Sequence, residues 1–333
     1  MSEPLQSCAV ERPLLSIVVP AYDEEKVLRE FHQRLFGVLQ DLPWQAEIVY
    51  VNDGSTDGTL SIMDALKEAD SRVAIVDLSR NFGKEIALTA GLDHATGDAV
   101  IVIDADLQDP PELIPELLKY FDEGYDVVYA QRISRSGEGI IKRGTAHLFY
   151  RLIRGFSRVK IPQDTGDFRL LSRRAVESLK RLREQHRFMK GLFAWIGYRN
   201  KAVPYHRQPR LAGHTKWNYW RLWNFALEGF TSFTIGPLKM ATYMGMVTAF
   251  AAFMYAIRII YTTLIYGDPV AGYPSLMVVV LFLGGVQLMT IGVLGEYLGR
   301  MFDETKKRPL YFLNDYRPAE SSQKLTATVS TAI

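Results

Sequence analysis

The sequence predicts an α/β domain with a mostly parallel sheet, followed by a juxtamembrane amphipathic helix and two transmembrane helices. In the first part of the chain, short apolar runs alternate with helical patterns. This alternation is typical of parallel strands joined by crossover helices. Farther along, Arg258 and Asp268 are the only charged residues between Lys239 and Glu296. That stretch therefore has the composition of membrane-spanning helices.

The elements of the α/β part follow from these patterns in chain order. We interpret five apolar runs as strands, at residues 14–20, 46–51, 73–77, 99–103 and 126–129. We interpret the intervening patterns as helices, at residues 24–40, 59–69, 83–95 and 111–122. No internal repeat interrupts this order, so we expect a single sheet.

The composition narrows the class of protein. The 333 residues give room for one large or two smaller domains, and the 39 basic and 37 acidic residues nearly cancel. This balance gives no case for nucleic-acid binding. A single cysteine, Cys8, rules out an internal disulfide and suits a reducing compartment. The N-terminus lacks the long apolar core of a signal peptide.

Two carboxylates follow the fourth strand, in Val100-Ile-Val-Ile-Asp-Ala-Asp-Leu-Gln108. Asp104 and Asp106 place hard oxygen ligands at the carboxyl end of a buried strand, where ligands bind in open α/β sheets. Mg²⁺ and Mn²⁺ take such carboxylates together with the oxygens of a substrate diphosphate. A metal-assisted site for a nucleotide-bound substrate is one interpretation. An ordinary acidic turn is the other.

Polar residues also follow the first two strands. Asp53 directly follows the second strand, where it would bind a nucleoside edge or a ribose hydroxyl, or serve as a turn residue. After the first strand, Pro20 fixes the exit, Tyr22 would lie against a base or ribose, and Glu24 suits the first turn of a helix. Three such strand ends at one edge of a sheet indicate a ligand site there.

Two apolar stretches are long enough to cross a bilayer as helices. They are Met240–Ile257, extended to about Tyr266, and Tyr273–Leu294. The intervening loop, residues 267–272, contains no Lys or Arg, whereas basic residues flank the pair. The positive-inside bias therefore predicts that both termini are cytoplasmic. A buried helical hairpin is the alternative.

Basic and aromatic residues precede the first apolar stretch, in the segment 201–221. Trp217–Phe230 would form an interfacial amphipathic helix, because aromatic and basic side chains together favour the headgroup region. Arg210 and Lys216 lie in this region. The segment would handle a lipid phosphate or serve as a plain membrane anchor.

Three motifs resemble the inverting glycosyltransferases of the GT-A fold, which has a Rossmann-like sheet. They are Ser16–Glu25, Val51–Thr59 and Asp104–Glu112. More narrowly, the chain resembles the polyprenyl-phosphate glycosyltransferases, among them the dolichol-phosphate mannose synthases and the bacterial bactoprenol glucosyltransferases. The match extends through Arg80–Glu85, Asp164–Arg169 and Arg210–Trp217, so that it covers about residues 14–310.

The resemblance implies a role for each matching residue. Asp53 would bind uridine, helped by Pro20, Tyr22 and Glu24. Asp104, Ala105, Asp106 and Gln108 would form the diphosphate site, in which Asp104, Asp106 and Gln108 hold Mg²⁺ or Mn²⁺. Asp167 matches the essential acidic position and is followed by Arg169, while Arg132, Arg210 and Lys216 would bind phosphates. Lys84 stands where many relatives have His, which leaves its role open.

A phosphate acceptor changes the usual need for a general base. A lipid monophosphate is already mostly ionised near neutral pH, since its second pKa is about 6. Asp167 therefore need not remove a proton. It would orient the donor sugar or Arg169, or steady the metal ligands.

The expected activity is transfer of a hexose, with glucose the best candidate, from a UDP-sugar to undecaprenyl or another polyprenyl phosphate. This reaction would serve cell-envelope glycan modification at the cytoplasmic face of the inner membrane, and the expected assembly is a homo-oligomer, with a tetramer as the candidate. GDP-mannose or a UDP-modified arabinose as donor, a processive polysaccharide synthase and a non-catalytic membrane subunit are the alternatives. The expected segments are an N-terminal tail at 1–13, the transferase domain at 14–215, the interfacial helix at 216–232, the membrane region at 233–300 and a C-terminal tail at 301–333.

Overall fold

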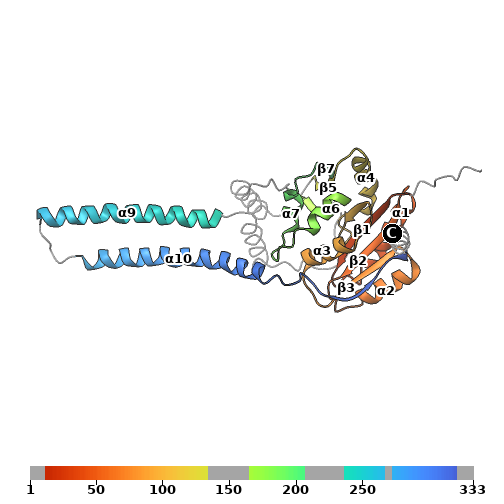
Figure 1. Ribbon diagram of the computed structural model, residues 1–333, viewed down its shortest axis with the longest axis horizontal. Coiled ribbons are helices and arrows are strands. Elements are labelled where there is room, and N and C mark those ends of the chain that lie inside the picture. The colour runs from red at the N-terminus through yellow and green to blue at the C-terminus, as the bar shows by residue number, and fades with distance from the viewer. Residues whose placement is uncertain (1–11, 134–164, 207–235, 267–271, 321–333) are drawn as a thin grey trace, which may run out of the picture. The chain divides into compact units, whose positions relative to one another are not determined.

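The computed structural model describes residues 12–133, 165–206, 236–266 and 272–320 (Figure 1). These residues belong to two compact units. The first contains residues 12–133, 165–206 and 309–320, and the second contains residues 236–308. The α/β architecture lies wholly in the first unit, so each unit is described by itself.

The first unit is built on one mixed sheet. Its strands are β1 (Leu14–Ala21), β2 (Gln45–Asn52), β3 (Val73–Leu78), β4 (Ala99–Val102), β5 (Val127–Arg132), β6 (Thr165–Ser172), β7 (Asn200–Tyr205) and β8 (Leu313–Arg317). They lie in the order β7-β5-β6-β4-β1-β2-β3-β8. The central four strands pair in parallel, as the alternating pattern predicts.

The sheet is mostly parallel, as predicted, because six of its eight strands run in one direction and two run against them. β6 runs antiparallel to both β4 and β5, and β8 runs antiparallel to β3. Both reversed strands lie outside the strand–helix alternation of the first part of the chain. The apolar runs predicted the five strands up to β5, whereas β6, β7 and β8 were not predicted.

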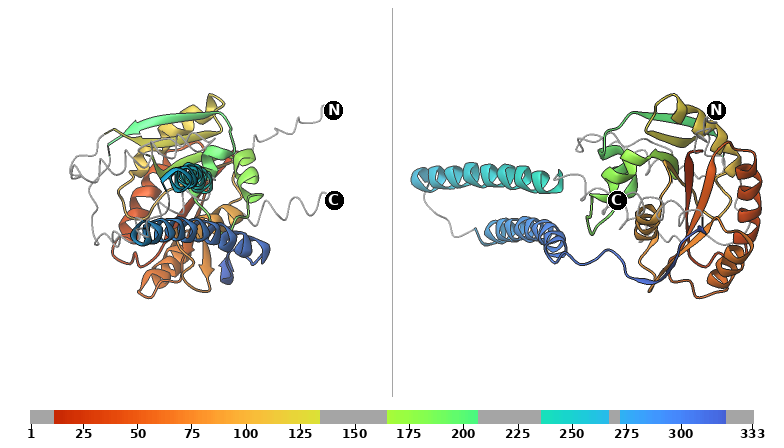
Figure 2. Two further views of the ribbon diagram at one scale, coloured as in Figure 1. Left: turned by 90° about the vertical axis from the view of Figure 1, so that its left-hand side faces the viewer. Right: turned by 45° about the vertical axis from the view of Figure 1, so that its right-hand side comes forward.

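Helices cover both faces of the sheet (Figure 2). They are α1 (Leu28–Gln40), α2 (Thr59–Ala69), α3 (Lys84–His94), η1 (Pro111–Leu113), α4 (Ile114–Asp122), α6 (Arg173–Lys180) and α7 (Met189–Trp195). The main core joins alternate residues of β1 with α1, including Leu15, Ile17 and Phe31. On the other face α3 lies so close to β1 that a Cβ at Gly91 would collide with Val18.

One edge of the sheet collects the chemically interesting segments. The parallel strands β1, β2, β3 and β4 all end at this edge, which we call the carboxyl edge. β6 begins there because it runs against β4, and β5 ends there because it runs against β6. Residues far apart in the sequence, such as Asp53, Asp104 and Asp167, are thereby brought to one side of the sheet.

The first helix starts later than its pattern predicts. The helical pattern begins at Glu24, whereas α1 begins at Leu28. Asp23 adopts a positive φ of 53°, and the Val27 and Leu28 amides both donate to the Glu24 carbonyl. The residues between strand and helix therefore form a turn at the carboxyl edge.

The second unit contains two long apolar helices that lie side by side, α9 (Gly236–Tyr266) and α10 (Tyr273–Thr305) (Figure 1). Large apolar side chains on both are exposed, among them Val247 and Leu288. Within the described residues, one stretch is long and apolar enough to cross a membrane, Phe282–Thr305 in α10. α9 contains a shorter apolar stretch, Ala241–Tyr255.

Candidate active site

A lysine lies between two carboxylates at the centre of the carboxyl edge. Lys84, the first residue of α3, places its Nζ 2.6 Å from Asp104 Oδ2 and 2.5 Å from Asp167 Oδ2. Asp104 follows β4, and Asp167 lies near the start of β6. Lys84, whose role the sequence left open, therefore forms ion pairs with two of the predicted site carboxylates, Asp104 and Asp167.

The charges of this cluster shift one another's pKa values. Burial and the nearby carboxylates of Asp167 and Asp109 raise the pKa of Asp104 to about 6, although Lys84 opposes this. Burial alone would raise the pKa of Asp167, but the Lys84 ammonium outweighs it and holds that pKa well below its usual range. The same two carboxylates raise the pKa of Lys84 against its own desolvation. The ammonium stays charged, and Asp167 stays a carboxylate.

Asp167 keeps one oxygen without a partner. Its Oδ1 is buried and accepts no hydrogen bond from any described residue. Arg169 lies next to it but donates instead to the backbone, with its Nη2 2.8 Å from the Gly166 carbonyl. The Arg169 guanidinium also lies 3.8 Å from the centre of the Phe193 ring. A buried, unpaired carboxylate oxygen is costly in a folded protein and often marks a position that a ligand completes.

Glu85 is a member of this cluster that the sequence analysis did not single out. Its Oε2 accepts the Met189 amide at 3.0 Å, which links α3 to the start of α7. Burial and the charge of Asp167 raise the pKa of Glu85 to about 7. Glu85 could have been predicted as a site residue, because it is the last residue of the motif Arg80–Glu85.

Asp53 lies on the same edge at the end of β2. Its two carboxylate oxygens accept the backbone amides of Phe82 and Gly83 at 2.7 and 3.0 Å. The next residue, Gly54, has a φ of 65°, and a Cβ there would come within 2.5 Å of the Arg80 carbonyl carbon. The loop after β2 is thus held against the loop after β3, and Gly54 is required for the close approach.

The loops after β1 and β2 are also joined to each other. The Asp23 amide donates to Ser55 Oγ at 3.1 Å, and the Thr56 amide donates to Asp23 Oδ1 at 2.9 Å. The Glu24 amide donates to Thr59 Oγ1 at 2.8 Å. Of the other predicted residues, Pro20 is buried within β1 and Tyr22 is half-buried in this turn. The three loops therefore form one connected wall of the site.

The segment after β4 forms a tight turn. The Gln108 amide donates to Asp106 Oδ1 at 3.1 Å, and Leu107 between them has a φ of 57°. Ala105 is buried beneath the turn. Asp106 therefore has a turn-forming role besides any role as a metal ligand.

A second polar group lies at the ends of β5 and β7. Arg132 Nε donates to the Tyr205 hydroxyl at 3.2 Å, and that hydroxyl donates to Asp109 Oδ1. Asp109 and Tyr205 were missed as site residues. Asp109 lies within the quoted motif Asp104–Glu112, whereas no sequence signal marked Tyr205.

Two predicted phosphate-binding residues, Arg210 and Lys216, lie outside the described residues, as does the expected interfacial helix. Within the described part of the chain, no group of three or more His, Cys, Asp or Glu side chains has the arrangement of a complete metal site.

Comparisons with known proteins agree along almost the whole chain. Residues 16–180 match the family model described as glycosyl transferase family 2, and residues 236–301 match the GtrB C-terminal hairpin. The chain is 50% identical over 299 residues to the prophage bactoprenol glucosyl transferase homolog of Escherichia coli, covering 90% of this chain and 98% of that protein. It is 50% identical over 301 residues to the bactoprenol glucosyl transferase of Shigella phage SfV, with coverage of 90% and 98%.

A third relative is more similar still. An uncharacterized glycosyltransferase of Synechocystis sp. is 54% identical over 301 residues, which cover 90% of this chain and 95% of that protein. The resemblance inferred from the strand-end motifs is confirmed by these matches. The chain belongs to glycosyltransferase family 2, in the group that carries the GtrB C-terminal hairpin, and it is a glycosyltransferase.

Proposed function

We propose that this enzyme transfers glucose from UDP-glucose to a polyprenyl phosphate, with inversion at the anomeric carbon. The observation that carries the proposal is the cluster of Lys84, Asp104 and Asp167, with one Asp167 oxygen unpaired. It occurs in a chain half identical to proteins described as bactoprenol glucosyl transferases. The product would be a polyprenyl-phosphate sugar for cell-envelope glycan modification.

The donor set fits a divalent cation such as Mg²⁺ or Mn²⁺. Asp104, Asp106 and Gln108 lie on the segment after β4 and carry side-chain oxygens, which are the ligands that such ions prefer. Asp104 and Asp106 would hold the metal, with Gln108 and the donor diphosphate nearby, since such ions are usually bound by one or two carboxylates plus substrate oxygens. When bound, the ion would neutralise charge on the departing diphosphate.

Other side chains would bind the nucleotide, the phosphates and the donor sugar. Asp53 and its loop would hold the uridine, because that loop is fixed by the Phe82 and Gly83 amides. Arg132 would bind a phosphate, as would Arg210 and Lys216. Asp167 would orient the donor sugar, since an ionised lipid phosphate needs no general base near neutral pH.

The acceptor would reach the site from a bilayer. We propose that α9 and α10 both span the inner membrane, with the transferase unit and both termini in the cytoplasm. The apolar exposed surfaces of both helices and the match to a C-terminal hairpin model support this topology. A homo-oligomer, such as a tetramer, is the assembly we propose.

Purified full-length enzyme, Mg²⁺ or Mn²⁺, undecaprenyl phosphate and a panel of radiolabelled sugar nucleotides test the proposal. We expect a lipid product carrying one sugar, formed most rapidly from UDP-glucose. Faster transfer from GDP-mannose or a UDP-modified arabinose would show that the donor is that sugar nucleotide and not UDP-glucose. A polymeric product would indicate a processive synthase, and absence of transfer from every donor would indicate a non-catalytic subunit.

A further inference from the structure

The sheet is completed by a strand that follows both apolar helices in the sequence. α10 ends at Thr305, and β8 begins at Leu313 within the first unit. β8 pairs antiparallel with β3, so that Asp77 lies opposite Asp315. After α10 the chain therefore returns to the first unit, where β8 forms the last strand of the sheet beside β3. β3 in turn leads into the loop 79–83.

The exposed residue Asn314 of β8 bonds to a buried polar pair, Asp77 and Asn52, and we call these three side chains the relay. Asn314 Nδ2 donates to Asp77 Oδ2 at 2.7 Å, and Asn52 Nδ2 donates to Asp77 Oδ1 at 2.6 Å. Both Asp77 and Asn52 are buried, at 4% and 2% exposure. A buried carboxylate needs donors to both oxygens, and here each oxygen receives one from a different strand.

The relay continues into the loop after β2. The Ser55 amide donates to Asn52 Oδ1 at 3.1 Å, and Ser55 Oγ accepts the Asp23 amide at 3.1 Å. Asn52 has its amide group facing Asp77 and its carbonyl oxygen facing Ser55. Because one side chain makes both bonds, its orientation links β8 to the loop that carries Asp53.

A backbone bond from Phe312, the residue just before β8, supports the third loop of the same wall. The Ser79 amide donates to the Phe312 carbonyl at 3.0 Å. Ser79 directly precedes the segment whose Phe82 and Gly83 amides hold the Asp53 carboxylate. The segment 312–314 therefore supports both loops that flank Asp53, one through the Asn314 side chain and one through the Phe312 backbone.

We propose that Asn314 is a positioning residue for nucleotide binding, acting through Asp77 and Asn52 on the loop 53–55. This inference rests on the proposed function, because it assumes that this loop holds the nucleotide of the donor. Loss of the Asn314 amide leaves Asp77 Oδ2 with one donor fewer. Held from one side only, the Asp77 carboxylate can rotate, and Asn52 loses the fixed acceptor that orients it toward Ser55.

The test measures UDP binding in the presence of Mn²⁺ by calorimetry on the full-length enzyme, together with KM for donor and acceptor. In Asn314→Ala we expect UDP affinity to fall about tenfold and donor KM to rise equally, because one charge-assisted hydrogen bond is lost. The acceptor KM should stay within about twofold. Phe312→Ala is the matched control, since its exposed side chain neighbours Asn314 and only its backbone bonds to Ser79.

A charge exchange separates positioning from a general structural effect. In Asn314→Asp two carboxylates face each other, so UDP affinity should fall further. Combining Asp77→Asn with Asn314→Asp restores the relay, because the new amide at 77 donates to the new carboxylate while its oxygen accepts Asn52. Recovery of UDP affinity in this double variant to within about threefold of wild type supports the proposal.

Three outcomes overturn the inference: wild-type UDP affinity in Asn314→Ala, an equal loss in Phe312→Ala, or a folded double variant without recovery. Failure of the proposed function is distinguishable from these. It would be a wild-type enzyme that binds UDP in an Asn314-dependent way but transfers no sugar to undecaprenyl phosphate.

Discussion

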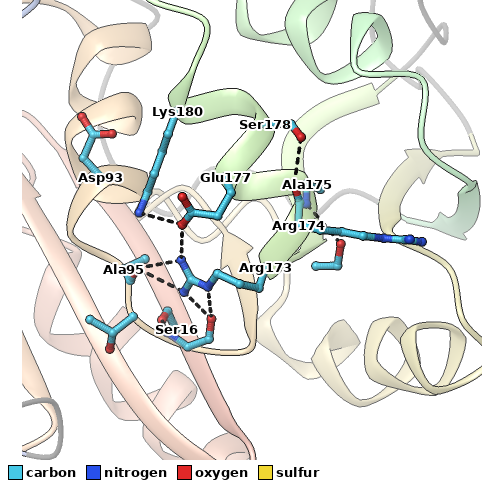
Figure 3. Close-up of polar contacts among 12 residues, drawn as sticks. Ser16, Asp93, Ala95, Arg173, Arg174, Ala175, Glu177, Ser178 and Lys180 are labelled. Carbon is cyan, nitrogen blue, oxygen red and sulfur yellow. Dashed lines mark hydrogen bonds and ion pairs between the residues drawn. The ribbon is translucent and has the colours of Figure 1, made fainter. Parts of the chain in front are cut away.

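Charged side chains have different surroundings at the carboxyl edge of the sheet and at the opposite, amino edge. At the amino edge, where the parallel strands begin, Glu47 accepts the Thr96 amide at 2.6 Å and the Thr96 hydroxyl at 2.9 Å, and it also bonds Ser16. Arg173, at the start of α6, donates to the carbonyls of Ala95 and Gly97 and pairs with Glu177 (Figure 3). These groups have protein partners that satisfy them.

The carboxyl edge leaves its charges incompletely satisfied. Asp167 has a buried oxygen without a partner among the described residues, and Glu85 and Asp104 have raised pKa values. The same elements supply both edges, since β4 and β6 run through the sheet from one edge to the other. The difference indicates that the amino edge stabilises the fold, whereas the carboxyl edge is arranged for a charged ligand.

The largest expected effect is at Asp104. Asp104→Asn should lower kcat/KM for sugar transfer about a thousandfold, because a carboxylate beside the diphosphate is replaced by a neutral amide. Glu177→Gln, on the exposed surface of α6, is the control and should keep wild-type turnover. The measurement is the initial rate with UDP-glucose and undecaprenyl phosphate. Equal rates in both variants would contradict the contrast between the edges.

Asp167→Asn should lower kcat about a hundredfold while UDP affinity changes by less than about threefold. The physical reason is that its buried Oδ1 has no partner among the described residues, so that a bound donor sugar would complete it, whereas Asp53 and its loop would hold the nucleotide. Donor binding and turnover must be measured on the same preparation. Unchanged turnover would exclude an essential role for the Asp167 charge.

Arg173→Met tests the amino edge. We expect the free energy of unfolding of the transferase unit to fall by about 2 kcal/mol, because the Ala95 and Gly97 carbonyls lose their donors. Methionine retains the apolar stem, so packing changes little. Chemical denaturation gives the stability, and kcat at a permissive temperature should remain at the wild-type value. A lowered kcat without a loss of stability would assign the amino edge a functional role.

The smallest effect concerns Glu85 and depends on pH. Its folded-state pKa of about 7 lies above the ordinary 4.5, so ionising Glu85 destabilises the folded protein as pH rises between these values. Glu85→Gln should match wild type in melting temperature near pH 4.5. By pH 7.5 it should be more stable by about 1 kcal/mol, less than the pKa shift alone implies, because the side chain is partly solvated. A stability difference that does not change with pH would contradict this assignment.

The sequence predicted the parallel centre of the sheet and the edge that carries the site, because apolar runs ending in Asp53 and Asp104 have a clear local signature. It could not predict β8, since Leu-Asn-Asp-Tyr-Arg317 is short and polar and becomes a strand only by pairing with β3. Lys84 was recognised as a site residue, but its place between two carboxylates depends on long-range contacts. Glu85, Asp109 and Tyr205 were missed for the same reason.

The position of β8 has a consequence for the order in which the enzyme is made. Protein synthesis proceeds from the N-terminus, so residues 313–317 leave the ribosome only after both apolar helices have been synthesised. Until then β3 forms the open edge of the sheet, and Asp77 lacks one of its two donors. The nascent chain therefore completes the proposed donor-binding wall last, after the helices that would be delivered to the membrane.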